Sequence, residues 1–190
     1  MTPEQYRDFK TSLRDALLAD GIDPADVDVR LQGSAAHFFS GPHKQFPGPG
    51  HPDWNPTTEQ AVRDWFGDDP ARPKSRPFDS GKKLGVDPKL SDYDVQISSD
   101  KMLEVVQRRW EEKDFKGELL KEPFGFANRD AVSQSFRKLN RWAHRWRGKT
   151  GRDIAPALFG SSGPPHKGSD ISAHFRPDDW IVDLVERSSR

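Results

Sequence analysis

The chain has 190 residues, with 30 basic and 30 acidic side chains and a formal net charge of zero, so no overall field draws it to nucleic acid or to a membrane surface. Apolar residues make up only 33% of the chain, but six tryptophans and twelve phenylalanines can fill a core. We therefore expect a single domain that spans residues 1–190 and has long polar loops. The lack of cysteine excludes disulfides, cysteine-ligated zinc and thiol nucleophiles, and no apolar run is long enough to span a membrane. The N-terminus also lacks the apolar stretch of a secretory signal, so we expect a soluble cytoplasmic protein, although a toxin module exported by another route would have the same features.

The first element predicted along the chain is a helix that ends at Gly21. Thr2 and Gln5 have the spacing of a capping box, and Pro3 suits the first helical position. Its apolar face is formed by residues at helical spacing: Tyr6, Phe9, Leu13, Ala16 and Leu17. Alternating apolar and polar residues over 27–31 then predict a half-buried strand, which runs into the turn Gln32-Gly33-Ser34 and a short helix over 35–39.

Residues 41–80 hold half of the sixteen prolines and lack a regular pattern. Only the stretch 57–66 has helical periodicity. We interpret 41–80 as a long insertion on the surface of the domain, because a loop of this length in a compact domain usually serves as a lid or binding loop.

Regular structure resumes at Ser91. Alternation over 91–98 predicts a strand, and Ser99 or Asp100 would cap the helix that follows. A second long helix is expected over 129–147, with the apolar stripe Val132, Phe136, Leu139, Ala143 and Trp146. Extended segments at 154–159 and 170–175, and a terminal segment around Trp180, complete the pattern. The fold class is therefore α/β, with a small mixed sheet flanked by helices.

Two short motifs carry the chemistry of this sequence. Asp92 and Asp94 are two residues apart on a predicted strand, so their carboxylates point to the same face. Paired carboxylates suit Mg²⁺, which prefers oxygen ligands and often bridges to substrate phosphates. Gly33 and Ser34, at the end of another strand, offer backbone N–H groups and a hydroxyl to those phosphates. Together the motifs predict a site for a metal-bound nucleoside triphosphate.

The stretches VRLQGSAA and SDYDVQIS resemble the signature of the DNA polymerase β-type nucleotidyltransferase superfamily, in which a Gly-Ser turn precedes a strand bearing Asp-x-Asp. The resemblance implies that Asp92 and Asp94 bind Mg²⁺ and that Gly33 and Ser34 hold the triphosphate; Ser91 also fits the pattern. A hydroxyl of the acceptor would attack the α-phosphorus and pyrophosphate would leave. The acceptor is left open between RNA ends, a protein hydroxyl, a small antibiotic and a second nucleotide. The family is frequent in bacterial toxin–antitoxin and conflict systems.

The chain departs from this family in two respects. The segment 35–91 between the motifs is longer than in compact members, which the insertion explains. A third carboxylate is expected on a later strand, where we favour Asp153 over its rival Asp170. If neither reaches the metals, the domain is a catalytically inactive module that binds nucleotide or RNA. A further alternative is an interaction protein in which Asp92 and Asp94 only face solvent.

A basic run lies between Arg137 and Arg152, with seven cations and no acid. We expect Arg141 and Arg145 to contact phosphate on RNA or a nucleotide tail, and Trp142 to stack on a base. The alternative is a solvated basic helix face. The histidines have no standard zinc spacing and are interpreted as packed or solvent-facing: His37, His43, His51 and His174.

Overall fold

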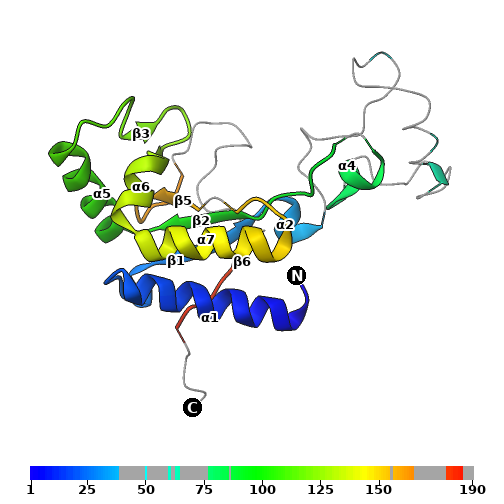
Figure 1. Cartoon of the computed structure of the whole chain (residues 1–190), viewed down its shortest axis with the longest axis horizontal. Coiled ribbons are helices and arrows are strands. Elements are labelled where there is room, and N and C mark those ends of the chain that lie inside the picture. The colour runs from blue at the N-terminus through cyan, green and yellow to red at the C-terminus, as the bar shows by residue number, and fades with distance from the viewer. Residues whose placement is uncertain are drawn as a thin grey trace.

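The computed structural model describes residues 1–38, 77–85, 87–154, 156–164 and 179–185, together with the isolated residues 50, 60, 63 and 64. Within these residues the chain forms six α-helices and a four-stranded mixed sheet (Figure 1). The predicted mixed α/β class is confirmed at this level. Most of the predicted insertion 41–80 and the whole extended segment 170–175 lie outside the described residues. Of the helix predicted over 57–66, only Gln60, Arg63 and Asp64 are described, and all three are helical.

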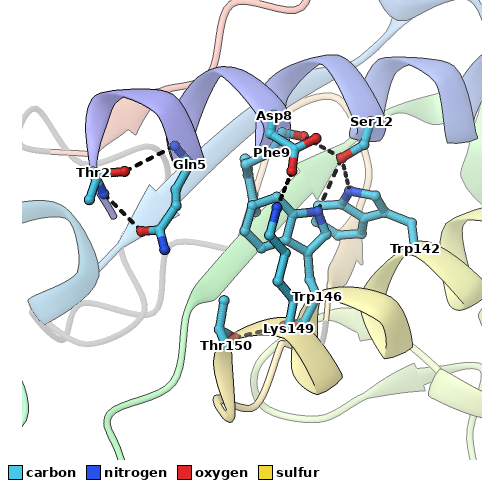
Figure 2. A network of polar contacts seen from close by, with 9 residues as sticks. All are labelled: Thr2, Gln5, Asp8, Phe9, Ser12, Trp142, Trp146, Lys149 and Thr150. Atoms are coloured by element: carbon cyan, nitrogen blue, oxygen red, sulfur yellow. Dashed lines mark hydrogen bonds and ion pairs between the residues drawn. The ribbon is translucent and has the colours of Figure 1, made fainter.

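The first helix, α1 (Pro3–Ala19), is capped as its sequence predicts. The Thr2 hydroxyl accepts a hydrogen bond from the Gln5 amide at 3.1 Å, and the Thr2 amide donates to Gln5 Oε1 at 2.9 Å (Figure 2). The residues buried on its inner face are Phe9, Leu13, Ala16 and Leu17. A 3₁₀ turn, η1 (Pro24–Asp26), leads from α1 to the sheet.

The sheet has the strand order β5-β2-β1-β6. Its centre is an antiparallel pair, β1 (Asp28–Gln32) and β2 (Asp94–Ser98), which lie within or beside the strands predicted over 27–31 and 91–98. On one side β5 (Ala157–Phe159) runs parallel to β2, and on the other β6 (Trp180–Ile181) pairs with β1. The strand predicted over 154–159 is reduced to β5 and a bridge at Ile154, because Pro156 has no amide hydrogen for a ladder bond. A separate hairpin, β3 (Leu120–Lys121) with β4 (Phe126–Ala127), was not predicted.

The helix predicted over 129–147 is two helices, α6 (Arg129–Ser135) and α7 (Arg137–Thr150). Phe136 breaks the helix with φ −120° and ψ 76° and buries its ring. The Asp20 carboxylate, at the end of α1, accepts hydrogen bonds from the amides of Lys138 and Leu139, at 2.8 to 3.0 Å. It satisfies the amides of the first turn of α7, as an N-cap side chain would. The prediction of one continuous helix over 129–147 was wrong because Asp20, which is distant in the sequence, caps the start of α7.

The remaining helices are α2 (Ser34–His37), α4 (Ser80–Lys83) and α5 (Asp100–Glu112). Ser99 caps α5, as predicted, by accepting from the Met102 amide at 3.3 Å. α5 and α6 lie at one end of the sheet, and α2 and α4 lie at the other (Figure 1). In the part of the chain described, no helix is both long and apolar enough to cross a bilayer.

One face of the central strands is apolar and the other is polar. Val29, Leu31, Val95 and Ile97 are buried in one core with the inner faces of α1, α5 and α7. The alternate positions carry Arg30, Gln32, Gln96 and Ser98, and Asp94 continues the same polar row. The polar face therefore holds the predicted carboxylate motif.

Candidate functional site

The Gly-Ser turn and the Asp-x-Asp motif lie side by side at one end of the central strand pair. In the register of β1 and β2, Gln32 is opposite Asp94, so Gly33 follows β1 directly beside the start of β2. Gly33 has φ 61° and ψ −145°, a region that is essentially restricted to glycine. A Cβ atom at this position would lie only 3.3 Å from Asp94 Oδ2. The two motifs, distant in sequence, thus form one surface.

Asp92 and Asp94 are both exposed and flank the buried residue Tyr93. This alternation places the two carboxylates on the face opposite the apolar core. Within the described residues Asp92 forms no ion pair, whereas Asp94 has interactions of its own in addition to its approach to Gly33. Two exposed carboxylates on one strand face supply the hard oxygen donors that Mg²⁺ prefers.

The backbone of Asp153 lies next to this pair, but its carboxylate is engaged elsewhere. Tyr93 and Ile154 form a parallel bridge, and the Tyr93 amide donates to the Asp153 carbonyl at 2.9 Å. The Asp153 carboxylate is 2.9 Å from Arg147 Nε and 4.0 Å from Lys89 Nζ. Among the described residues, no group of three or more histidine, aspartate or glutamate side chains is arranged to hold a metal ion. The rival Asp170 lies outside them.

Ser91 connects the site to a segment that the sequence did not single out. Its hydroxyl accepts a hydrogen bond from the Asp79 amide at 2.9 Å, and its own amide donates to Asp79 Oδ1 at 3.0 Å. Arg152 donates to both carboxylate oxygens of Asp79, at 2.5 and 2.6 Å, and to the Ser91 carbonyl at 2.9 Å. The Ser91 hydroxyl therefore ties residues 78–80 to the strand that carries Asp92 and Asp94.

Two aromatic rings pack against Arg152 of the Asp79–Arg152 pair, and the pairing shifts the pKa values of both residues. The guanidinium of Arg152 lies 4.6 Å from the ring centre of Phe78 and 5.4 Å from that of Tyr93. Its hydrogen bonds lower the pKa of Asp79 below the ordinary 3.8, and those bonds raise the pKa of Arg152. Burial raises the pKa of the Tyr93 phenol. The pair is charged at neutral pH, and no local sequence signal joins two residues so far apart in the chain.

A buried polar network continues from Asp94 along the polar face of the sheet. Gln32 Nε2 donates to Gln96 Oε1 at 2.7 Å and to Asp179 Oδ2 at 3.2 Å, and Gln96 Nε2 donates to Ser98 Oγ at 3.2 Å. The Asp179 side chain is only 1% exposed, and Arg30 Nη1 lies 4.0 Å from it. Asp179 immediately precedes β6, so the network connects β6 to the central strands. Sequence reasoning missed this carboxylate because its partners lie far away in the chain.

The basic run divides into paired and unpaired cations. Arg147, Lys149 and Arg152 form ion pairs with Asp153, Asp8 and Asp79, respectively. The other four have no ion pair within the described residues: Arg137, Lys138, Arg141 and Arg145. Arg141 and Arg145, the predicted phosphate contacts, are exposed on α7. They are therefore available to an anionic ligand.

Trp142 does not stack on a base, and that prediction was wrong. Its side chain is fully buried, and the indoles of Trp142 and Trp146 donate to the Ser12 hydroxyl at 3.0 and 3.1 Å (Figure 2). Both indoles also contact Phe9 edge-on, with ring centres 5.0 and 5.4 Å apart. Trp142 therefore faces α1 and belongs to the core. Of the histidines considered, the side chain of His37 and the whole of His43, His51 and His174 lie outside the described residues.

Comparison of the chain with protein-family models, curated proteins and solved structures gave no match. The geometry of the chain is therefore the basis for a functional assignment.

Proposed function

We propose that this chain is a magnesium-dependent nucleotidyltransferase with a nucleotidyltransferase-like fold, which moves a nucleoside monophosphate from a triphosphate to an acceptor hydroxyl. The observation that carries the proposal is the contact between the two motifs: the position of a Gly33 Cβ would be 3.3 Å from Asp94 Oδ2. A turn suited to phosphates and a pair of carboxylates suited to Mg²⁺ thus meet at one end of the two central strands. The acceptor is RNA, a protein or a small molecule.

The chain's own residues divide into two roles in this proposal. Asp92 and Asp94 would hold Mg²⁺, which when bound supplies charge stabilisation to the reacting phosphates. Both residues are exposed, which fits that role, because an ion from solvent can reach them. The Gly33–Ser34 turn would orient the triphosphate through its amides and the Ser34 hydroxyl. Positioning and charge stabilisation account for most of the rate in transfers of this kind.

Ser91 would act by positioning. Its hydroxyl is engaged by the Asp79 amide, so it supports the strand that carries the carboxylates. Asp153 would assist the metal only after release from Arg147, which lies 2.9 Å from its carboxylate.

The ion pair of Asp153 favours a second candidate, a catalytically inactive module of the same fold that binds nucleotide or RNA. With the third carboxylate neutralised by Arg147, two carboxylates would bind a metal–nucleotide complex without completing a site for transfer. This candidate predicts nucleotide binding without release of pyrophosphate.

The test is incorporation of label from α-³²P-labelled nucleoside triphosphates, with pyrophosphate release measured in the same samples. RNA, the protein itself and a second nucleotide serve as acceptors. We expect Mg²⁺-dependent transfer by the wild type, none by Asp94→Asn, and full activity in the exposed control Asp114→Asn. Transfer at the wild-type rate by Asp94→Asn would contradict the metal assignment. Nucleotide binding by the wild type without transfer to any acceptor would favour the inactive module.

A further inference from the structure

A basic pocket lies between the C-terminal half of α5 and the junction of α6 with α7. Its volume is about 520 Å³, within the range of ligand-binding pockets. Five cations line it: Arg108, Arg109, Arg137, Lys138 and Arg141. The pocket brings the basic run of α7 together with two arginines of α5. Two of the helices that line it, α5 and α6, lie at the end of the sheet away from α2 and α4 (Figure 1).

The positive charge of this pocket is only partly offset by the acids that line it. None of the five cations forms an ion pair in the part of the chain that the structure describes. Two acids also line the pocket, Asp20 and Glu112, so five cations face two carboxylates, and the carboxylate of Asp20 accepts hydrogen bonds from the first amides of α7. Although the chain has no net charge, unpaired cations are concentrated in this pocket.

Two residues that line the pocket each have a buried polar atom without a hydrogen-bond partner in the described part of the chain. Arg109 Nε and Ser135 Oγ are shielded from solvent, and neither has a hydrogen-bond partner within the described residues. Buried donors of this kind are rare, because an unmade hydrogen bond costs free energy. These two atoms lie beneath the pocket surface, so a ligand would contact the exposed side chains of Arg108, Arg137, Lys138 and Arg141 instead.

We infer that this pocket binds the phosphate backbone of a polynucleotide. Four of its five cations are arginines, whose planar fork matches phosphate oxygens. No aromatic side chain is among its described lining residues, so it offers no platform for a base and favours binding without sequence preference. The cations also continue beyond it: Arg137, Arg141 and Arg145 follow at steps of about 6 Å along α7. A repeating anion fits that row better than a single phosphate.

This inference goes beyond the proposed transfer activity and does not depend on Asp92 or Asp94. The test is fluorescence anisotropy of a labelled uridine oligonucleotide of about 20 nucleotides, titrated with protein at 50 to 200 mM KCl. The pocket variant is Arg108→Gln/Arg137→Gln/Arg141→Gln. The control, Arg7→Gln/Lys116→Gln/Lys121→Gln, removes the same charge from exposed positions outside the pocket. A third variant, Arg108→Lys/Arg137→Lys/Arg141→Lys, keeps the charge.

The pocket variant should bind roughly tenfold more weakly at low salt, and its slope of log affinity against log salt should be about 2 smaller, since each lost phosphate contact removes about 0.7. The control variant should stay close to wild type, the lysine variant should lose less affinity than the pocket variant because it keeps the charge, and circular dichroism should show all of them folded. Binding should persist in EDTA and in Asp92→Asn/Asp94→Asn, which separates this site from the proposed active site. Equal binding by the pocket and control variants would overturn the inference. Displacement of the oligonucleotide by tripolyphosphate at equal phosphate concentration would also overturn it, in favour of a small polyphosphate ligand.

Discussion

Gly33 is the residue at which backbone conformation and proposed chemistry meet. Its φ of 61° and ψ of −145° lie where other residues are strained, and Asp94 Oδ2 occupies the space beside it. A side chain at this position would strain the backbone of the turn and would also press against the carboxylate of Asp94. The structure thus explains why the first residue of the Gly-Ser motif is glycine: its backbone conformation and the nearby Asp94 leave no room for a side chain.

Gly33→Ala should lower the free energy of unfolding by about 1 to 3 kcal/mol and weaken Mg²⁺-dependent nucleotide binding, because the new Cβ would displace Asp94. Gly21→Ala is the matched control, since Gly21 also has a positive φ, 79°, but nothing lies within 4 Å of its Cβ position. Urea denaturation and nucleotide titration of both variants make the comparison. Wild-type nucleotide affinity in folded Gly33→Ala would show that the turn and Asp94 do not act together.

Asp79 gives stability a defined dependence on pH. Its hydrogen bonds from Arg152 lower its folded pKa below 3.8, so the contribution of the pair is complete above that pH and is lost as the pH falls through the folded pKa. Asp79→Asn should cost about 1.5 to 3 kcal/mol at pH 7. The difference in unfolding free energy from wild type should shrink in acid. Urea melts from pH 7 to pH 3 measure this, and a difference that stays constant over the range would contradict the assignment.

At the scale of elements, one hydroxyl adds polar contacts to the apolar packing of α1 on α7. Ser12 Oγ accepts from both tryptophan indoles of α7 and donates to the Phe9 carbonyl at 3.2 Å (Figure 2). Two buried donors therefore share one acceptor. An exposed ion pair between Lys149 of α7 and Asp8 of α1 also joins the two helices.

Ser12→Ala should destabilise the protein by about 1 to 3 kcal/mol, because it leaves two indole N–H groups without an acceptor. Thr11→Ala, on the exposed side of the same helix, should change stability by no more than about 0.5 kcal/mol. Urea denaturation followed by tryptophan fluorescence reports both variants. A loss in Ser12→Ala no larger than in Thr11→Ala would mean that the hydroxyl does not hold the interface.

Elements that depend on neighbouring residues could be predicted from the sequence, and those that depend on distant ones could not. The capping box of Thr2 and Gln5 and the cap at Ser99 are local signals, and both helices begin where predicted. The break at Phe136 requires the carboxylate of Asp20 from another helix. In the same way, the spacing of Asp92 and Asp94 indicated a shared face, whereas Asp79 with Arg152 and Gln32 with Asp179 required the folded chain.

At the scale of the whole molecule, a net charge of zero conceals a separation of charge. Unpaired cations gather around the N-terminal half of α7, and exposed carboxylates lie at the start of β2. α7 is about 21 Å long. Its first turn lines the basic pocket, and its last turn leads to Ile154, which forms a bridge with Tyr93 beside the carboxylates. Under both proposals, a polynucleotide held at one end of the molecule is a natural acceptor for chemistry at the other.

The most direct test of the proposed site is calorimetric titration of the four nucleoside triphosphates, with and without Mg²⁺. The proteins are wild type, Asp92→Ala/Asp94→Ala, and the control Asp114→Ala/Glu118→Ala, which removes two exposed acids elsewhere. We predict Mg²⁺-dependent binding of at least one triphosphate to wild type and control, and its loss in the Asp92/Asp94 variant with the fold retained. Absence of binding to the wild type, or equal binding by the Asp92/Asp94 variant, would contradict the assignment of these carboxylates to a nucleotide site.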